Sequence, residues 1–158
     1  MIRQNFNADW TVEKGDGNSR MNSFLGNTQT KTVHLPYDAM IHEARTPDTK
    51  NGAQTGFYPG GGYIFQKHFT APQAWQGKPV SLVFEGVYQT ALVYLNGWLL
   101  TRNVNGYAEF TVEAGSYLKY GADNLLKVIA DNSLEPNSRW YTGSGIYRPV
   151  RLLVGNKV

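Results

Sequence analysis

Histidine and serine, the usual bases and nucleophiles of hydrolytic sites, occur in this sequence without the spacing that catalysis or metal binding requires. The three histidines, His34, His42 and His68, have no second histidine or cysteine at ligand spacing, and cysteine is absent. Ser144 lies in Gly143-Ser144-Gly145, which lacks the Gly-x-Ser-x-Gly spacing of a nucleophile elbow. Gly60-Gly61-Gly62 is followed by neither Lys-Ser nor Lys-Thr, so it does not match a phosphate-binding loop. We therefore expect no metal and no other cofactor, although a hard cation held by oxygen ligands stays open.

The acidic side chains are spread along the chain without a readable pairing. Two carboxyl groups that flank a glycosidic bond can hydrolyse it, but a single sequence does not say which of them approach one another. Asp38 is one of several in predicted loops. For each of these residues we expect a solvated position or a cap.

Large aromatic rings beside turn residues are the more informative chemical signal. Tyr58 lies within a long polar loop, and Trp140 and Tyr141 follow Pro136. Sugar rings present flat faces of C–H groups that stack on the electron-rich faces of such aromatics, while Asn, Arg and Asp side chains can bind the hydroxyls. An alternative is that the same rings only plug the ends of a β-sandwich.

The elements that must position these residues are predicted to be short strands. Asn96-Gly97 between two apolar runs predicts a two-residue hairpin, and Tyr117 to Tyr120 before Gly121 is compatible with one helical turn. The sequence contains 17 Gly and 7 Pro, too many breakers for a helix bundle and too few for a disordered chain. The predicted strands cover residues 63–69, 80–85, 91–95, 98–100, 108–112, 125–130 and 148–154. This spacing predicts an all-β fold with antiparallel strands, and its expected core includes Phe65, Phe69, Leu82, Phe84, Val93, Leu95, Leu125, Val128 and Val150.

The length of 158 residues fits one domain, residues 1–158. Residues 1–30 are turn-rich and weakly periodic, so we expect an irregular N-terminal segment. Residues 42–62 are polar and glycine-rich and predict a long loop, a kind of segment that is usually functional or mobile.

Charge and hydropathy exclude several classes of partner. There are 15 Lys and Arg against 12 Asp and Glu, and the net charge of +3 is scattered, which does not fit a nucleic-acid-binding face. No stretch approaches the roughly 20 apolar residues of a membrane helix. The first residues carry no signal-peptide pattern, which favours a cytoplasmic protein unless a leader has been removed.

The segment from Arg139 to Val150, RWYTGSGIYRPV, strongly resembles the end of the N-terminal sugar-binding domain of glycoside hydrolase family 2, the β-galactosidase and β-glucuronidase family. Further pieces of the chain resemble landmarks of the same domain in the same order, and together they cover most of residues 31–154. These pieces lie at residues 33–38, 62–69, 86–97, 105–110 and 122–128.

The resemblance implies a jelly-roll β-sandwich similar to galactose-binding domains. It also implies a longer enzyme with an immunoglobulin-like domain and a (β/α)8 barrel that carries both catalytic glutamates. A barrel typically needs about 250 residues, so we expect this chain to hold no catalytic residue and to be inactive alone. The expected function is that of a non-catalytic sugar-binding domain that packs on the barrel and lends loops to the rim of the active site. Its expected partners are the carbohydrate substrate of the parent enzyme and the missing catalytic domains.

Two other functions stay open. One is an independent carbohydrate-binding module, which would need an exposed aromatic platform and affinity for sugar without the barrel. The other is a complete small enzyme. Calorimetric titration with galactose and lactose, together with a chromogenic galactoside assay, separates the three.

Within the resemblance, residues 137–141 form the expected functional edge. In the family an acidic residue often stands in this stretch and helps to position the sugar, and counting back without gaps from Gly145 places that position on Arg139. An arginine cannot ligate a cation, but its five donors can bind sugar hydroxyls or a carboxylate of the barrel. The candidate substrate-binding residues are therefore Arg139, Trp140, Tyr141 and Tyr58. An alternative is that Arg139 and Trp140 only support the interface between domains.

Overall fold

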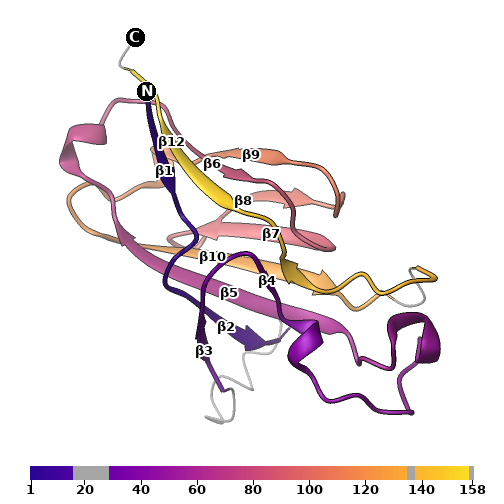
Figure 1. Cartoon of the computed structure of the whole chain (residues 1–158). Coiled ribbons are helices and arrows are strands. Elements are labelled where there is room, and N and C mark those ends of the chain that lie inside the picture. Colours follow the sequence, from indigo (N-terminus) through magenta and orange to yellow (C-terminus); the bar gives the residue numbers. More distant parts are fainter. Residues whose placement is uncertain (16–28, 135–137, 157–158) are drawn as a thin grey trace.

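The computed structural model describes residues 1–15, 29–134 and 138–156 and shows two antiparallel sheets packed as a sandwich (Figure 1). The four-stranded sheet has the order β1-β12-β6-β9, and its strands are β1 (Ile2–Asn5), β12 (Val150–Val154), β6 (Val80–Phe84) and β9 (Phe110–Glu113). The six-stranded sheet has the order β3-β2-β5-β10-β7-β8, and its strands are β3 (Lys31–Val33), β2 (Trp10–Lys14), β5 (Gly61–Thr70), β10 (Asp123–Asn132), β7 (Thr90–Leu95) and β8 (Trp98–Asn103). A third ribbon joins β4 (Tyr37–Asp38) to β11 (Gly145–Ile146). The expected all-β sandwich is confirmed.

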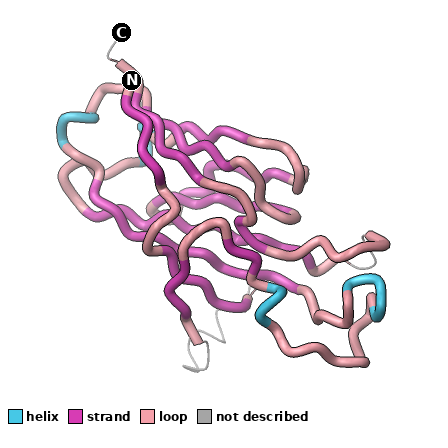
Figure 2. Tube along the Cα trace, in the orientation of Figure 1, coloured by secondary structure: helices cyan, strands magenta, loops and turns pink. Residues whose placement is uncertain are grey.

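Helical structure in the described residues is limited to four 3₁₀ turns (Figure 2), which are η1 (Met40–His42), η2 (Gly52–Thr55), η3 (Gln73–Trp75) and η4 (Gly115–Tyr117). The helical turn expected at residues 117–120 is therefore misplaced, because the turn ends at Tyr117. In the described part of the chain, no helix is long and apolar enough to span a membrane.

The N-terminal segment departs from the expectation of irregular structure. Residues 2–5 form β1 at the edge of the small sheet, and residues 10–14 form β2 in the large sheet; residues 16–28 lie outside the described part. Trp10 is fully buried, and its indole N–H donates to the Phe6 carbonyl at 2.7 Å. The segment therefore contributes a strand to each sheet and a large side chain to the core.

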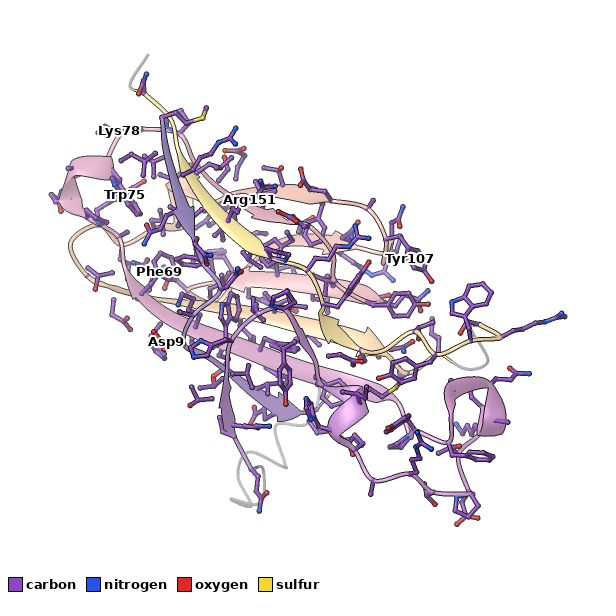
Figure 3. All side chains as sticks on the ribbon, in the orientation of Figure 1. Asp9, Phe69, Trp75, Lys78, Tyr107 and Arg151 are labelled. Atoms are coloured by element: carbon purple, nitrogen blue, oxygen red, sulfur yellow. The ribbon has the colours of Figure 1, made fainter. Side chains whose placement is uncertain are left out.

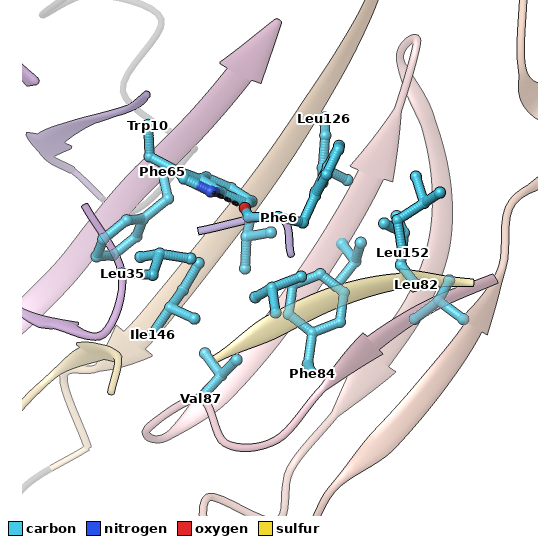
Figure 4. Packing of buried hydrophobic residues seen from close by; sticks show 14 of the residues in the cluster. Phe6, Trp10, Leu35, Phe65, Leu82, Phe84, Val87, Leu126, Ile146 and Leu152 are labelled. Atoms are coloured by element: carbon cyan, nitrogen blue, oxygen red, sulfur yellow. Dashed lines mark hydrogen bonds between the residues drawn. The ribbon is translucent and has the colours of Figure 1, made fainter. Parts of the chain in front are cut away.

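The core lies between the two sheets (Figure 4) and contains seven of the nine residues expected there as fully buried side chains: Phe65, Leu82, Phe84, Val93, Leu95, Val128 and Val150. Leu125 and Phe69 are only half-buried. Leu125 is three residues from Val128, and side chains alternate along a strand, so the two cannot share a face. Leu126, opposite Leu95, takes the core position instead.

The long strands β5 and β10 connect two ends of the sandwich with different character. One end, which we call the hairpin end, holds the turn at Asn96-Gly97 and residues 115–121. Asn96 and Gly97 have φ of 52° and 88°, which confirms the predicted hairpin. The other, the loop end, holds residues 43–60 and 138–144 (Figure 1). The predicted loop at 42–62 is shorter than expected, since η1 ends at His42, β5 begins at Gly61, and η2 lies between them.

Candidate functional site

Two of the four candidate residues meet at the loop end although 83 positions separate them in the sequence. The rings of Tyr58 and Tyr141 pack edge to face with centroids 5.5 Å apart and planes at 64°. Tyr58 is half-buried against the core, and the Arg45 guanidinium lies 5.1 Å from the centre of its ring. Tyr141 remains 37% exposed, so the pair presents one ring to the core and one to solvent.

Asp38 anchors Tyr141 to the sandwich. The Tyr141 hydroxyl donates to Asp38 Oδ2, while Oδ1 accepts the backbone N–H of Ser144 at 2.9 Å and of Met40 at 3.0 Å. Burial raises the pKa of Tyr141, and the hydrogen bond to the negatively charged Asp38 raises it further. The hydroxyl therefore stays protonated and keeps its role as donor at neutral pH.

The segment that carries Tyr141 is also held by Asn132, at the end of β10. Asn132 is nearly buried, and its Nδ2 donates to the Gly143 carbonyl at 2.8 Å and to Thr142 Oγ1 at 3.2 Å. Gly143 has a φ of +73°, and a Cβ there would lie 2.8 Å from Asp38 Oδ2. Only glycine meets both conditions. The chain then continues from Gly143 to Ile146, which is fully buried in the core.

Arg139 and Trp140 stand apart from this cluster. Both are exposed, Trp140 by 62%, and neither side chain makes a hydrogen bond, ion pair or ring contact with another described residue. The Trp140 carbonyl accepts a hydrogen bond from Ser138 Oγ at 2.7 Å. Asn137, the first residue of the expected functional edge, lies outside the described residues. The structure therefore joins Tyr58 to Tyr141 and leaves Arg139 and Trp140 open to solvent.

Two hollows are lined mainly by the loop that carries Tyr58. One, of about 250 Å³, is lined by Arg45, Thr46, Pro47 and Phe57. The second, of about 310 Å³, is lined by Thr46, Asp48, Thr49, Lys50, Pro59, Gly61 and Ser133. Among the described residues, the buried atoms Thr49 Oγ1 and Asn51 Oδ1 have no hydrogen-bond partner, but their burial keeps them from any ligand in these hollows. The groups that could bind a polyhydroxylated ring here are the Phe57 ring and the Arg45 guanidinium.

The described histidines and carboxylates do not gather into a metal-binding group. Among the described residues there is no group of three or more His, Asp or Glu side chains that could hold a metal ion. His42 stacks on Tyr37 at 4.9 Å, His68 pairs with Asp123 at 2.7 Å, and His34 Nδ1 accepts the backbone N–H of Asp9 at 3.4 Å. All three histidines thus have structural contacts.

The anchoring residues Asp38, Asn132 and Arg45 were missed by sequence reasoning. Asp38 contacts Tyr141 and Ser144 across 103 and 106 positions, and it lies in a strand where a loop carboxylate was expected. No local pattern distinguishes it from the other acidic residues. A signal for Asn132 does exist, because a polar residue that ends a buried strand must find hydrogen-bond partners.

Comparisons with known proteins agree with this architecture. The family described as glycosyl hydrolase 2 galactose-binding domain-like matches residues 10–149. A β-galactosidase of Bacteroides ovatus is 37% identical over 95% of this chain and 18% of its own length, and a putative β-glucuronidase of Formosa agariphila is 32% identical over 98% and 15%.

Solved structures give the same result. A glycosyl hydrolase family 2 member from Bacteroides cellulosilyticus superimposes with a TM-score of 0.88 and 32% identity, over 99% of this chain and 21% of that one. A β-glycosidase from Bacteroides vulgatus superimposes with a TM-score of 0.84 and 36% identity, over 98% of this chain and 20% of that one. The chain thus spans about a fifth of the length of these relatives. It belongs to the glycosyl hydrolase 2 galactose-binding domain-like family, the N-terminal β-sandwich domain of family 2 glycoside hydrolases.

Proposed function

We propose that this chain serves as the non-catalytic sugar-binding domain of a longer β-galactosidase-like hydrolase. In this proposal the domain packs on the catalytic barrel, and its loop end contributes to the rim of the active site. The substrate class is a β-galactoside, as the name of the Bacteroides ovatus relative suggests. Arg139, Trp140, Tyr141 and Tyr58 are the residues through which the domain would reach the sugar.

The single observation that carries the proposal is that one aromatic side chain of the loop end is fixed by the sandwich while its two neighbours are exposed and without contacts among the described residues. Tyr141 is fixed by Asp38 and by the Tyr58 ring, whereas Arg139 and Trp140 extend into solvent. An indole that is 62% exposed costs free energy in water unless a partner or ligand covers it. A sugar between this domain and the barrel would cover the indole and accept hydrogen bonds from the Arg139 guanidinium.

The isolated chain is expected to have no glycosidase activity, because a retaining hydrolase needs two carboxyl groups about 5–5.5 Å apart, and we assign both to the barrel. The measurement is turnover of nitrophenyl β-galactoside, with calorimetric titration of galactose and lactose in parallel. Turnover that disappears when one of the chain's own carboxylates is mutated would identify a complete small enzyme. Sugar binding at the loop end without the barrel would identify an independent binding module.

The decisive experiment is Arg139→Ala in the intact hydrolase. We expect kcat/KM to fall tenfold or more, equivalent to about 1.4 kcal/mol of transition-state binding, while the melting temperature stays unchanged. Nitrophenyl β-galactoside and β-glucuronide are both assayed, so that the substrate class is tested as well. Arg3→Ala, another exposed arginine on β1, is the matched control. Unchanged kinetics for Arg139→Ala would show that the guanidinium does not contact sugar.

A further inference from the structure

A second aromatic surface lies at the hairpin end, away from the loop end. Trp98, the first residue of β8, is 65% exposed, and Tyr117, the last residue of η4, is 41% exposed. Their ring centroids are 6.4 Å apart and their planes are tilted by 49°. Two segments from different parts of the chain thus form one open aromatic surface.

A polar network holds the backbone from which these rings project. Asn96 Nδ2 donates to the Tyr117 carbonyl and to Asn124 Oδ1, both at 2.8 Å. Asn124 is fully buried and binds Lys119 twice, accepting its backbone N–H at 2.8 Å and donating to its carbonyl at 2.9 Å. The backbone that carries both rings is therefore fixed before any ligand arrives, which lowers the entropy cost of binding.

A cavity of about 380 Å³ adjoins Tyr117 and supplies polar groups. Its lining includes Lys78, Glu113, Ser116, Tyr117 and Tyr120. The ammonium group of Lys78 donates, the Glu113 carboxylate accepts, and the Ser116 hydroxyl does both. An aromatic wall beside a few donors and acceptors, in a space of this size, is typical of a small-molecule site.

The exposed apolar area is small for a stable protein interface. Trp98, Tyr117 and Leu99, which is 52% exposed, would together bury less than about 400 Å² at no more than roughly 250 Å² per full side chain. Each partner in a standard protein–protein interface buries about 800 Å², of which about 57% is apolar, so the apolar area here falls slightly below that of a standard interface. A ligand of one to a few rings fits the available surface better than a second protein.

We propose that the hairpin end is a second carbohydrate site, which stacks a pyranose ring of a neutral oligosaccharide on Trp98 and Tyr117. Lys78, Glu113 and Ser116 would then bind the hydroxyls of the same or the next sugar unit. Lys78 lies at the end of the sandwich opposite Tyr107 (Figure 3). The ten residues of β10 separate this surface from Asn132 by roughly 30 Å at 3.3 Å per residue. The site would hold a chain of sugars without taking part in the hydrolysis proposed for the loop end.

The test is an NMR titration of the ¹⁵N-labelled chain with β-1,4-galactotetraose and, separately, with cellotetraose. We expect the indole N–H signal of Trp98 and the amides of Ser116 and Tyr117 to shift. Trp98→Ala should weaken binding at least tenfold, or about 1.4 kcal/mol, whereas Trp98→Tyr should retain most of it. Val104→Ala removes an apolar side chain that is 55% exposed and belongs to neither surface, and this variant should bind as the unmodified chain does.

Three outcomes would overturn the proposal. The first is the absence of any shift with either sugar at millimolar concentration. The second is a set of shifts confined to the Trp140 indole and its neighbours, which would place binding at the loop end. The third is a dimer, seen by sedimentation, that Trp98→Ala dissociates, because the surface would then be a protein interface.

Discussion

Replacing Gly143 by alanine tests whether the loop end is held together through Asp38. Gly143 has a φ of +73°, and an added Cβ would lie 2.8 Å from Asp38 Oδ2 and 2.9 Å from its Cγ. The carboxylate cannot move aside freely, since it accepts hydrogen bonds from the Tyr141 hydroxyl and from two backbone N–H groups. The substitution therefore strains the backbone and displaces an anchored charge.

Gly121 is a matched control for the backbone strain. It has the same φ of +73°, but an added Cβ would lie 3.0 Å from Gln73 Oε1, the end of an exposed side chain that can move away. Left-handed backbone strain costs about 1–2 kcal/mol, and we expect Gly121→Ala to lose only this. Gly143→Ala should also lose one or two hydrogen bonds to a charged group, worth about 1.5–3 kcal/mol each. Allowing for partial relaxation, the two variants should differ by about 2–4 kcal/mol.

The assay is equilibrium unfolding in urea, with thermal melting as a second readout. For a chain of this length, each kcal/mol corresponds to about 2–4 °C in Tm, so Gly143→Ala should melt roughly 4–16 °C below Gly121→Ala. In an Asp38→Ala background, Gly143→Ala should cost only the backbone strain, and the double-mutant cycle should show a coupling of similar size. Equal losses for the two glycine variants, or no coupling to Asp38, would refute the reasoning.

Two further predictions concern stability. Phe84 is fully buried and stacks on Phe110 with ring centroids 5.1 Å apart. Phe84→Ala should therefore lower the unfolding free energy by about 3–5 kcal/mol. A loss under about 1 kcal/mol, measured by urea unfolding, would contradict the core position of Phe84. Burial raises the pKa of Tyr63, whose hydroxyl donates to Glu43 Oε1 at 3.2 Å. The protonated hydroxyl therefore contributes fully to the unfolding free energy below the unfolded pKa of about 10, and this contribution is lost as the pH rises further. Above pH 10 the unfolding free energy should fall more steeply in the unmodified chain than in Tyr63→Phe, with slopes that differ by up to about 1.4 kcal/mol per pH unit. Identical slopes in the two proteins would contradict the raised pKa of Tyr63.

The parts of the fold that could be predicted from sequence are those with a local pattern. The turn at Asn96-Gly97 needs only two adjacent residues with positive φ, and both adopt it. The alternating strands β6 and β7 lie where their apolar residues indicated. The error at Leu125 arose where the apolar run is nearly continuous, because alternation then no longer selects a face.

The first strand, β1, could not be predicted because its stabilising contacts come from the other end of the chain. All four residues of β1 are exposed, so no apolar alternation marks it, and its register pairs Ile2 with Val154. β1 also converts β12 into a central strand of the four-stranded sheet. Such pairing depends on sequence-distant backbone groups rather than on side-chain pattern.

Within residues 137–141, the candidate site contains one residue that the sandwich fixes and two that have no contacts among the described residues to fix them. Tyr141 is fixed by Asp38, Tyr58 and the neighbouring contacts of Asn132, all set by the sandwich itself. Arg139 and Trp140 have no such contacts among the described residues, so the described part of the domain does not fix their side chains. Substitutions on the Tyr141 side should therefore be detected as changes in the stability of the isolated chain. Substitutions at Arg139 and Trp140 should leave that stability unchanged. Under the proposed function they would change activity only when the partner domain or the sugar is present, so their role is to be tested in the intact hydrolase.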